Sequence, residues 1–181
     1  MKVTPTAIPE VLIVEPRVYG DERGFFYESF NARQFAEATG RQAVFVQDDH
    51  VRSARDVVRG LHYQVGVPQE KLVRVIAGAI FAVVVDLRAA SPFLGRWVAI
   101  ELSAENRRQL WIPAGFAFGS VVTSDFAECL VKSTDYWTPQ NERTILWNDA
   151  ALAIEWPLKG AAVVSAKDNQ GRALADAEVF A

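Results

Sequence analysis

The chain has 181 residues, of which half are hydrophobic, and a formal net charge of -3. This length fits one domain with a sizeable core, and the lack of a basic run argues against nucleic-acid binding. The single Cys129 excludes an internal disulfide framework, the apolar runs are too short to cross a bilayer, and no signal peptide is visible, so we expect a cytoplasmic protein without membrane contact.

Short strands dominate the predicted elements. Runs that are rich in β-branched and aromatic residues and bounded by Gly, Pro, Asn or Asp are expected to form strands. In chain order they are Val11–Val14, Phe25–Phe30, Ala43–Val51, Leu72–Ile76, Ile80–Leu87, Trp97–Leu102, Leu110–Ile112 and Ala127–Lys132.

One early helix is predicted at Ala32–Thr39. Asn31 can cap it, Gln34 stands at the reciprocal position of a capping box, and Gly40 ends it. The tail from residue 161 is expected to hold short helical turns. Many short strands with few helices predict an all-β fold, a barrel or jelly roll with one or two short peripheral helices, formed by residues 1–181 as a single domain.

The period-two pattern of a strand assigns side chains to faces. In the run that starts at Ile80, the odd positions Phe81 to Leu87 form one apolar face, and the even positions form the other. In Ala127–Lys132 the face that carries Cys129 and Val131 is small and apolar, so Val131 is expected to point inside.

The segment Val58–Gln64 carries the clearest chemical signal. It contains His62, one of two histidines, with Arg59 three residues before it and Lys71 nine residues after it. A base that titrates near neutral pH, beside two cations, suits proton abstraction next to a carbonyl, because the enolate forms beside positive charge. Taken alone, a histidine on a strand is more often a structural imidazole than a catalytic base.

Other chemistries find little support. His50 and His62 are twelve residues apart and Cys129 has no partner, so neither a metal site nor another cofactor is expected. Cys129 lies among apolar residues and is interpreted as a buried structural thiol. No nucleophile elbow and no phosphate-binding glycine loop occur.

Several motifs, read in order, resemble the dTDP-4-dehydrorhamnose 3,5-epimerase family, a metal-free branch of the cupin β-barrels. The matching segments are Asp21–Glu28, Val46–His50, Val58–Gln64, Lys71–Val75, Val85–Arg88, Trp111–Ala117, Lys132–Tyr136, Glu142–Arg143 and Ile154–Pro157. The resemblance implies a cupin-type jelly roll that binds a nucleotide-diphosphate sugar, dTDP-linked, and forms homodimers in which a strand of one subunit completes the site of the other.

The resemblance also implies roles for single residues. His62 would remove the proton alpha to a 4-keto group, Asp168 would orient its imidazole, and Lys71 would stabilise the enolate oxygen. Arg23 and Arg59 would hold the diphosphate. The positions implied to contact substrate are Arg23, Phe26, Glu28, Gln47, Arg59, Phe118, Val131, Trp137 and Arg143.

The chain departs from the family pattern inside this site. Phe118 stands where the family has a histidine, and Val131 stands where it has a tyrosine, the presumed general acid. Ala82 replaces an aspartate, and Asp49 and Val51 replace asparagine and serine. Because valine cannot donate a proton, reprotonation would fall to water, Tyr63 or Tyr27.

Three hypotheses follow from this pattern. The first is an epimerase acting on a nucleotide-linked 4-keto-6-deoxy sugar, with inversion at one carbon, C3 or C5. The second is a related isomerase or eliminating enzyme, which needs a base and an oxyanion stabiliser but no acid on the opposite face. The third is a non-catalytic nucleotide-sugar-binding protein.

Overall fold

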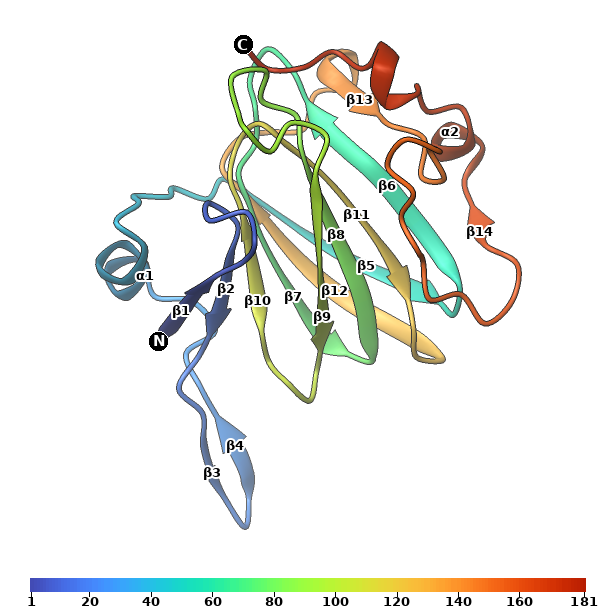
Figure 1. Ribbon diagram of the computed structural model, residues 1–181. Helices are drawn as coiled ribbons and strands as arrows, with labels where there is room; N and C mark the ends of the chain where they lie inside the picture. Colours follow the sequence, from blue (N-terminus) through green and yellow to red (C-terminus); the bar gives the residue numbers. More distant parts are fainter.

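The computed structural model describes residues 1–181 and is built around two β-sheets that face each other (Figure 1). The first sheet has the strand order β1-β2-β10-β7-β12-β5, and the second has the order β13-β6-β11-β8-β9, with β14 beside β6. All strands pair antiparallel except β14, which runs parallel to β6. The predicted all-β jelly roll is confirmed, as two hydrogen-bonded sheets and not one closed barrel.

The strand bounds are as follows. The first sheet comprises β1 (Lys2–Pro5), β2 (Leu12–Glu15), β5 (Gln47–Ala54), β7 (Lys71–Ala77), β10 (Gln109–Ile112) and β12 (Phe126–Ser133). The second comprises β6 (Val57–Gln64), β8 (Ala79–Asp86), β9 (Trp97–Ser103), β11 (Phe116–Val122), β13 (Glu142–Thr144) and β14 (Val163–Val164).

The helix α1 covers Ala32–Thr39, as predicted. The side chain of Asn31 accepts a hydrogen bond from the Gln34 backbone N–H at 3.1 Å, and Gly40 closes the helix in the left-handed conformation. The Gln34 side chain donates to Glu28 and does not complete a capping box. The tail holds the predicted turns, namely α2 (Ala166–Asn169) and a 3₁₀ turn at Leu174–Asp176; another 3₁₀ turn covers Pro139–Asn141.

The edge strands β13 and β14 of the second sheet are absent from the predicted strands, and so are two inner strands, β6 and β11. Each contains a glycine, Gly60 in β6 and Gly119 in β11, and glycine weakens a strand signal. The structure shows why glycine is present. A Cβ on Gly60 would lie 2.5 Å from the Phe118 carbonyl oxygen, and a Cβ on Gly119 would lie 2.8 Å from Leu61. Only glycines let these two strands approach so closely.

Other strand predictions were too long. The run from Ala43 forms a strand only from Gln47 onward, and the run from Phe25 forms only the second half of a small hairpin. This hairpin pairs β3 (Tyr19–Asp21) with β4 (Gly24–Phe26) and extends away from both sheets (Figure 1).

Alternation along β8 separates two cores, as predicted from the period of two. Ile80, Ala82 and Val84 lie in the core between the sheets, whereas Val83 and Val85 lie in the core beneath the C-terminal segment. A third cluster packs α1 on the first sheet through Phe35 and Trp111, whose rings are 5.0 Å apart. The C-terminal segment therefore covers the outer face of the second sheet.

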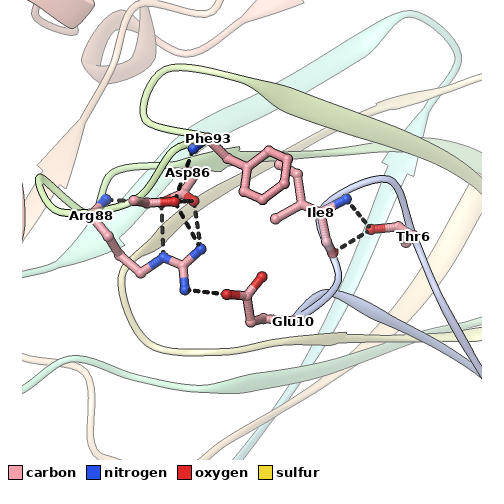
Figure 2. Close-up of polar contacts among 7 residues, drawn as sticks. Thr6, Ile8, Glu10, Asp86, Arg88 and Phe93 are labelled. Atoms are coloured by element: carbon pink, nitrogen blue, oxygen red, sulfur yellow. Dashed lines mark hydrogen bonds and ion pairs between the residues drawn. The ribbon is translucent and has the colours of Figure 1, made fainter.

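A polar cluster joins the N-terminal segment to the second sheet (Figure 2). Asp86, fully buried at the end of β8, accepts hydrogen bonds from Arg88 Nε at 2.9 Å and Arg88 Nη2 at 2.6 Å. Arg88 Nη1 donates to Glu10 Oε1 at 2.9 Å, and the guanidinium lies 4.5 Å above the ring of Phe116. Glu10 belongs to the loop between β1 and β2, so Arg88 holds this loop in place.

No helix is both long and apolar enough to cross a membrane.

Candidate active site

A cavity of about 510 Å³ lies between the two sheets. One wall consists of residues from β5, β7 and β12 of the first sheet, and the other consists of residues from β6 and β11 of the second. The bulge between Phe118 and Ser120 interrupts the pairing of β11 with β6. Because the two walls belong to opposing sheets, they can place groups on both faces of a molecule bound between them.

His62 projects from β6 into this cavity and is held from behind by Asp168. Its Nε2 lies 2.7 Å from Asp168 Oδ1, with 32% of the imidazole side chain but only 5% of the carboxylate side chain exposed. Asp168 Oδ2 accepts the Gly60 backbone N–H at 3.2 Å. The Asp168 backbone N–H in turn donates to Ser165 Oγ, which caps α2.

The electrostatics of the pair fix the role of each ring nitrogen. Burial alone would raise the pKa of Asp168, but the hydrogen bond and charge of His62 and the Gly60 N–H hold it below its ordinary value. An ionised carboxylate only accepts hydrogen bonds, so Nε2 carries a proton. In the neutral ring, Nδ1 of His62 then keeps the free lone pair and can act as a base.

Lys71 lies on the opposite wall, on β7. Its Nζ donates to Gln69 Oε1 at 2.8 Å and to Ser133 Oγ at 3.3 Å. Burial lowers the pKa of Lys71, and the charges of Asp49 and Glu142 partly offset this effect. Neither direct hydrogen-bond partner is charged, so the ammonium group can stabilise an anion in the cavity.

Arg59 and Trp137 also line the cavity. Arg59 is exposed, and its Nε donates to Ser53 Oγ at 2.9 Å. The Trp137 indole donates to Glu142 Oε2 at 3.0 Å, and its backbone N–H donates to Gln47 Oε1 at 2.8 Å. The Gln47 side chain thus fixes the start of the loop that carries Trp137.

The rest of the cavity wall is largely apolar. Phe118 and Val131 both line it and pack against the core between the sheets, so Val131 points inside as predicted. Cys129 lies beside them on β12, where burial raises its thiol pKa to about 11. This thiol stays protonated at neutral pH, in agreement with a structural role.

Six of the sequence-predicted residues do not line this cavity. Two of them, Asp168 and Gln47, contact cavity residues from behind, and the other four lie elsewhere. Arg23 and Phe26 lie on the β3–β4 hairpin, where Arg23 pairs with Asp21. Glu28 accepts from the side chains of Asn31 and Gln34 near the start of α1. Arg143 lies on β13, and its Nε donates to Glu178 Oε2 at 2.9 Å.

The two tyrosines considered for reprotonation are poorly placed. The ring of Tyr63 packs edge-on against Phe180, at 5.9 Å between centroids, in the core beneath the C-terminal segment. Burial there raises the pKa of its phenol. Tyr27 follows the β3–β4 hairpin, stacks on Phe25, and is not among the cavity residues.

Sequence reasoning gave no role to Gln69 and Glu142, which line the cavity, or to Ser133, which contacts Lys71. It noted Asp49 only as a departure from the family pattern. The strand register explains their positions. On the inner face of the first sheet, Ser133 is the direct partner of Lys71, and Asp49 is the direct partner of Val131. Alternation from Lys71 and Val131 gives the correct face, but the sequence alone does not show which residues are opposed across strands.

Comparison with known proteins agrees with this architecture. Residues 5–176 match the family model described as dTDP-4-dehydrorhamnose 3,5-epimerase. A Pseudomonas aeruginosa protein named dTDP-4-dehydrorhamnose 3,5-epimerase is 59% identical over 99% of each chain. A Legionella pneumophila dTDP-6-deoxy-D-glucose-3,5-epimerase, solved with dTDP-4-keto-L-rhamnose, superposes with a TM-score of 0.95 at 48% identity, covering 98% of this chain and 94% of that one.

A further solved structure adds a different regiochemistry. It is a 3'-monoepimerase from Streptomyces bikiniensis in complex with dTDP-quinovose, similar at a TM-score of 0.89 and 29% identity, over 97% of this chain and 88% of that one. The likeness of these structures along almost the whole chain confirms the predicted cupin-type jelly roll.

Proposed function

The chain belongs to the dTDP-4-dehydrorhamnose 3,5-epimerase family and is a nucleotide-sugar epimerase, and we propose that its substrate is a dTDP-linked 4-keto-6-deoxy sugar. One observation carries the proposal. His62, which is paired with Asp168, and Lys71 line opposite walls of one cavity. A base and an oxyanion stabiliser on either side of a sugar ring are what proton removal beside a ketone requires.

The reaction begins with removal of the proton alpha to the keto group. His62 Nδ1 accepts this proton, and the electron pair of the C–H bond moves into a carbon–carbon double bond as the keto oxygen becomes negative. The Lys71 ammonium group stabilises that oxygen in a site of low dielectric. Asp168 stabilises the imidazolium that forms, through the 2.7 Å contact.

Substrate binding falls to groups nearer the solvent. The exposed Arg59 suits a diphosphate, because its planar guanidinium makes paired, charge-assisted hydrogen bonds. Trp137, half exposed beside the cavity, offers an aromatic face for stacking. Phe118 and Val131 present apolar surface to the sugar.

We propose a homodimer in which the β3–β4 hairpin enters the cavity of a second copy. Phe25 and Phe26 are 61% and 69% exposed, which is unusual for neighbouring aromatic residues in a monomer. Arg23 and Phe26 do not line their own cavity. They belong to the β3–β4 hairpin, which extends from the sheets (Figure 1). Insertion into a second copy would bury these rings and bring Arg23 to the diphosphate.

The finer proposal is inversion at a single carbon, C3 or C5. Its support is the apolar wall around Val131. Tyr63 borders the cavity, but its ring packs in the core beneath the C-terminal segment. A structural neighbour is named as a 3'-monoepimerase, so single inversion is compatible with this fold.

Incubation with a dTDP-linked 4-keto-6-deoxyhexose in D2O tests the proposal. NMR is expected to show deuterium and inverted configuration at one carbon beside the ketone. His62→Asn, which cannot act as the base, serves as the control. A wild-type protein that neither exchanges nor inverts either carbon would refute the proposed function, and inversion at both carbons would refute only the finer proposal.

A further inference from the structure

Inversion at a carbon needs a proton donor on the face opposite the base. His62 approaches from the second sheet. A proton that returns from the same side restores the original configuration, so the donor has to project from the first sheet. The question is therefore which ionisable side chains the first sheet directs into the cavity.

The strand register gives the answer. Residues 48–51 and 53 of β5 all border the cavity. Alternation places the side chains of Asp49, Val51 and Ser53 on the inward face, together with Val131 and Cys129 of β12, and those of Asp48 and His50 on the other face. The outward pair is engaged on the outer surface, since Lys132 donates to Asp48 at 2.8 Å and His50 contacts Glu128 at 2.9 Å. The ionisable groups on the inward face are then Asp49, Cys129 and Lys71.

Two of these three groups are unsuited to donate. Transfer of the Cys129 proton would leave a thiolate between Val51 and Val75, its direct partners on the neighbouring strands. Burial in such surroundings disfavours the charged form. Transfer of a proton from Lys71 would remove the positive charge that stabilises the enolate.

We propose that Asp49 is the general acid that delivers a proton to the face opposite His62. Asp49 pairs directly with Val131 across β5 and β12, so their Cβ atoms are about 4.5–5.5 Å apart. The short valine leaves the space above it open to the carboxyl group. The assignment rests on the proposed function and names a residue that completes it.

Contacts around Asp49 give it a defined orientation. Gln47 Nε2 donates to both carboxyl oxygens, at 3.0 and 2.9 Å. Gln47 is itself fixed, because its Oε1 accepts the Trp137 backbone N–H at 2.8 Å. Asp49 is partly exposed at the cavity wall, so water reaches its carboxyl group, which has to take up a proton before it can act as the acid.

The step balances without a further reactant. The O–H bond of Asp49 breaks and its electron pair stays on the carboxylate. The electron pair of the enolate double bond forms the new C–H bond, and the keto group is restored beside Lys71. His62 then loses its proton to water, and Asp49 gains one from water, which resets the site.

Asp49→Asn tests the assignment in D2O with the same dTDP-linked 4-keto-6-deoxyhexose. Deuterium exchange and inversion are measured separately by NMR, because exchange needs only His62 and Lys71 whereas inversion also needs the acid. Asp48→Asn is the matched control, an identical change one residue away on the outer face. Titration with dTDP verifies that each variant still binds nucleotide.

The expected result is that Asp49→Asn keeps exchange with retention of configuration and loses inversion by about 100-fold or more, while Asp48→Asn matches the wild type in both. Undiminished inversion in Asp49→Asn would overturn the assignment and leave the proposed function standing. A parallel loss of exchange and inversion would also overturn it, because Asp49 would then act by supporting Lys71. A wild-type protein without exchange would overturn both proposals.

Discussion

His62 and Asp168 are 106 residues apart in the chain, yet their side chains meet at 2.7 Å. The contact joins β6 to α2 in the segment that covers the second sheet. It ties a residue within a sheet to a short helix outside it.

Asp168→Asn is expected to lower kcat by about 100-fold or more, with little change in KM. An amide cannot stabilise the imidazolium as a carboxylate does, and it also permits the wrong ring tautomer. Steady-state kinetics measure the loss, with Asp176→Asn in the neighbouring 3₁₀ turn as the control. Equal kcat in the two variants would exclude Asp168 from the mechanism.

The alkaline limit of activity is expected to lie below the ordinary lysine pKa of about 10.4. Burial lowers the pKa of Lys71, and the group works only when charged, so kcat falls as pH rises through that lowered value. Lys71→Arg, which stays charged, is expected to extend activity to higher pH. A pH profile of kcat for both proteins checks this, and identical alkaline limbs would contradict it.

Arg88→Met is expected to destabilise the fold by about 3 kcal/mol, because it leaves a buried carboxylate without its partner. Burial alone would raise the pKa of Asp86, but hydrogen bonds from Arg88 and Ser91 hold it below its ordinary value. Urea denaturation measures the difference, and Arg96→Met, at an exposed position, is the control.

The Asp86 carboxylate, held by Arg88 and Ser91, is also expected to make the stability of the fold decline at low pH. A carboxyl group with a lowered pKa in the fold contributes stability above its unfolded pKa of about 3.9, and this contribution is lost as pH falls through the lowered value. Wild-type stability from this source is therefore expected to persist at pH 5 and to decline below about pH 4. In Arg88→Met the decline is expected to disappear or reverse.

Gly60→Ala is expected to cost more than about 1 kcal/mol of stability and to impair catalysis. Gly60 has a φ of +107°, and its added Cβ would meet the Phe118 carbonyl at 2.5 Å. Thermal unfolding and kcat are the measurements. Gly20→Ala, whose added Cβ has no contact shorter than 3.5 Å, is expected to leave stability unchanged.

Subunit complementation tests the proposed hairpin exchange. Arg23→Ala and His62→Ala are each expected to be weakly active, since they lack the diphosphate contact and the base, respectively. If the hairpin of one copy serves the cavity of the other, a mixed dimer contains one site with both defects and one with none. Activity is then expected to rise on mixing, and a mixture no more active than its components would contradict the exchange.

Local patterns in the sequence predicted much of the fold. The ends of α1 follow from Asn31 and Gly40, and the two faces of β8 follow from alternation, because both signals act over a few residues. The strands β6 and β11 were not predicted because each contains a glycine, Gly60 or Gly119. These glycines are required by close packing between the strands, which is a tertiary feature that local sequence patterns do not show.

The candidate site was likewise predictable only where local motifs identify its residues. His62, Lys71 and Asp168 were identified through motifs, whereas the opposition of Asp49 to Val131 depends on strand register, which the sequence does not display. The positions of Arg23 and Arg143 outside the cavity were equally hidden, because they depend on the direction that a hairpin and an edge strand take.

Because Asp168 follows His62 by 106 residues, the two partners are synthesised at different times. Ribosomes add about 5–20 residues per second, so the carboxylate is made roughly 5–20 s after the histidine. During that interval the two sheets can begin to assemble around an imidazole that lacks its partner. A nascent chain therefore lacks the His62–Asp168 contact until its final segment folds onto the second sheet.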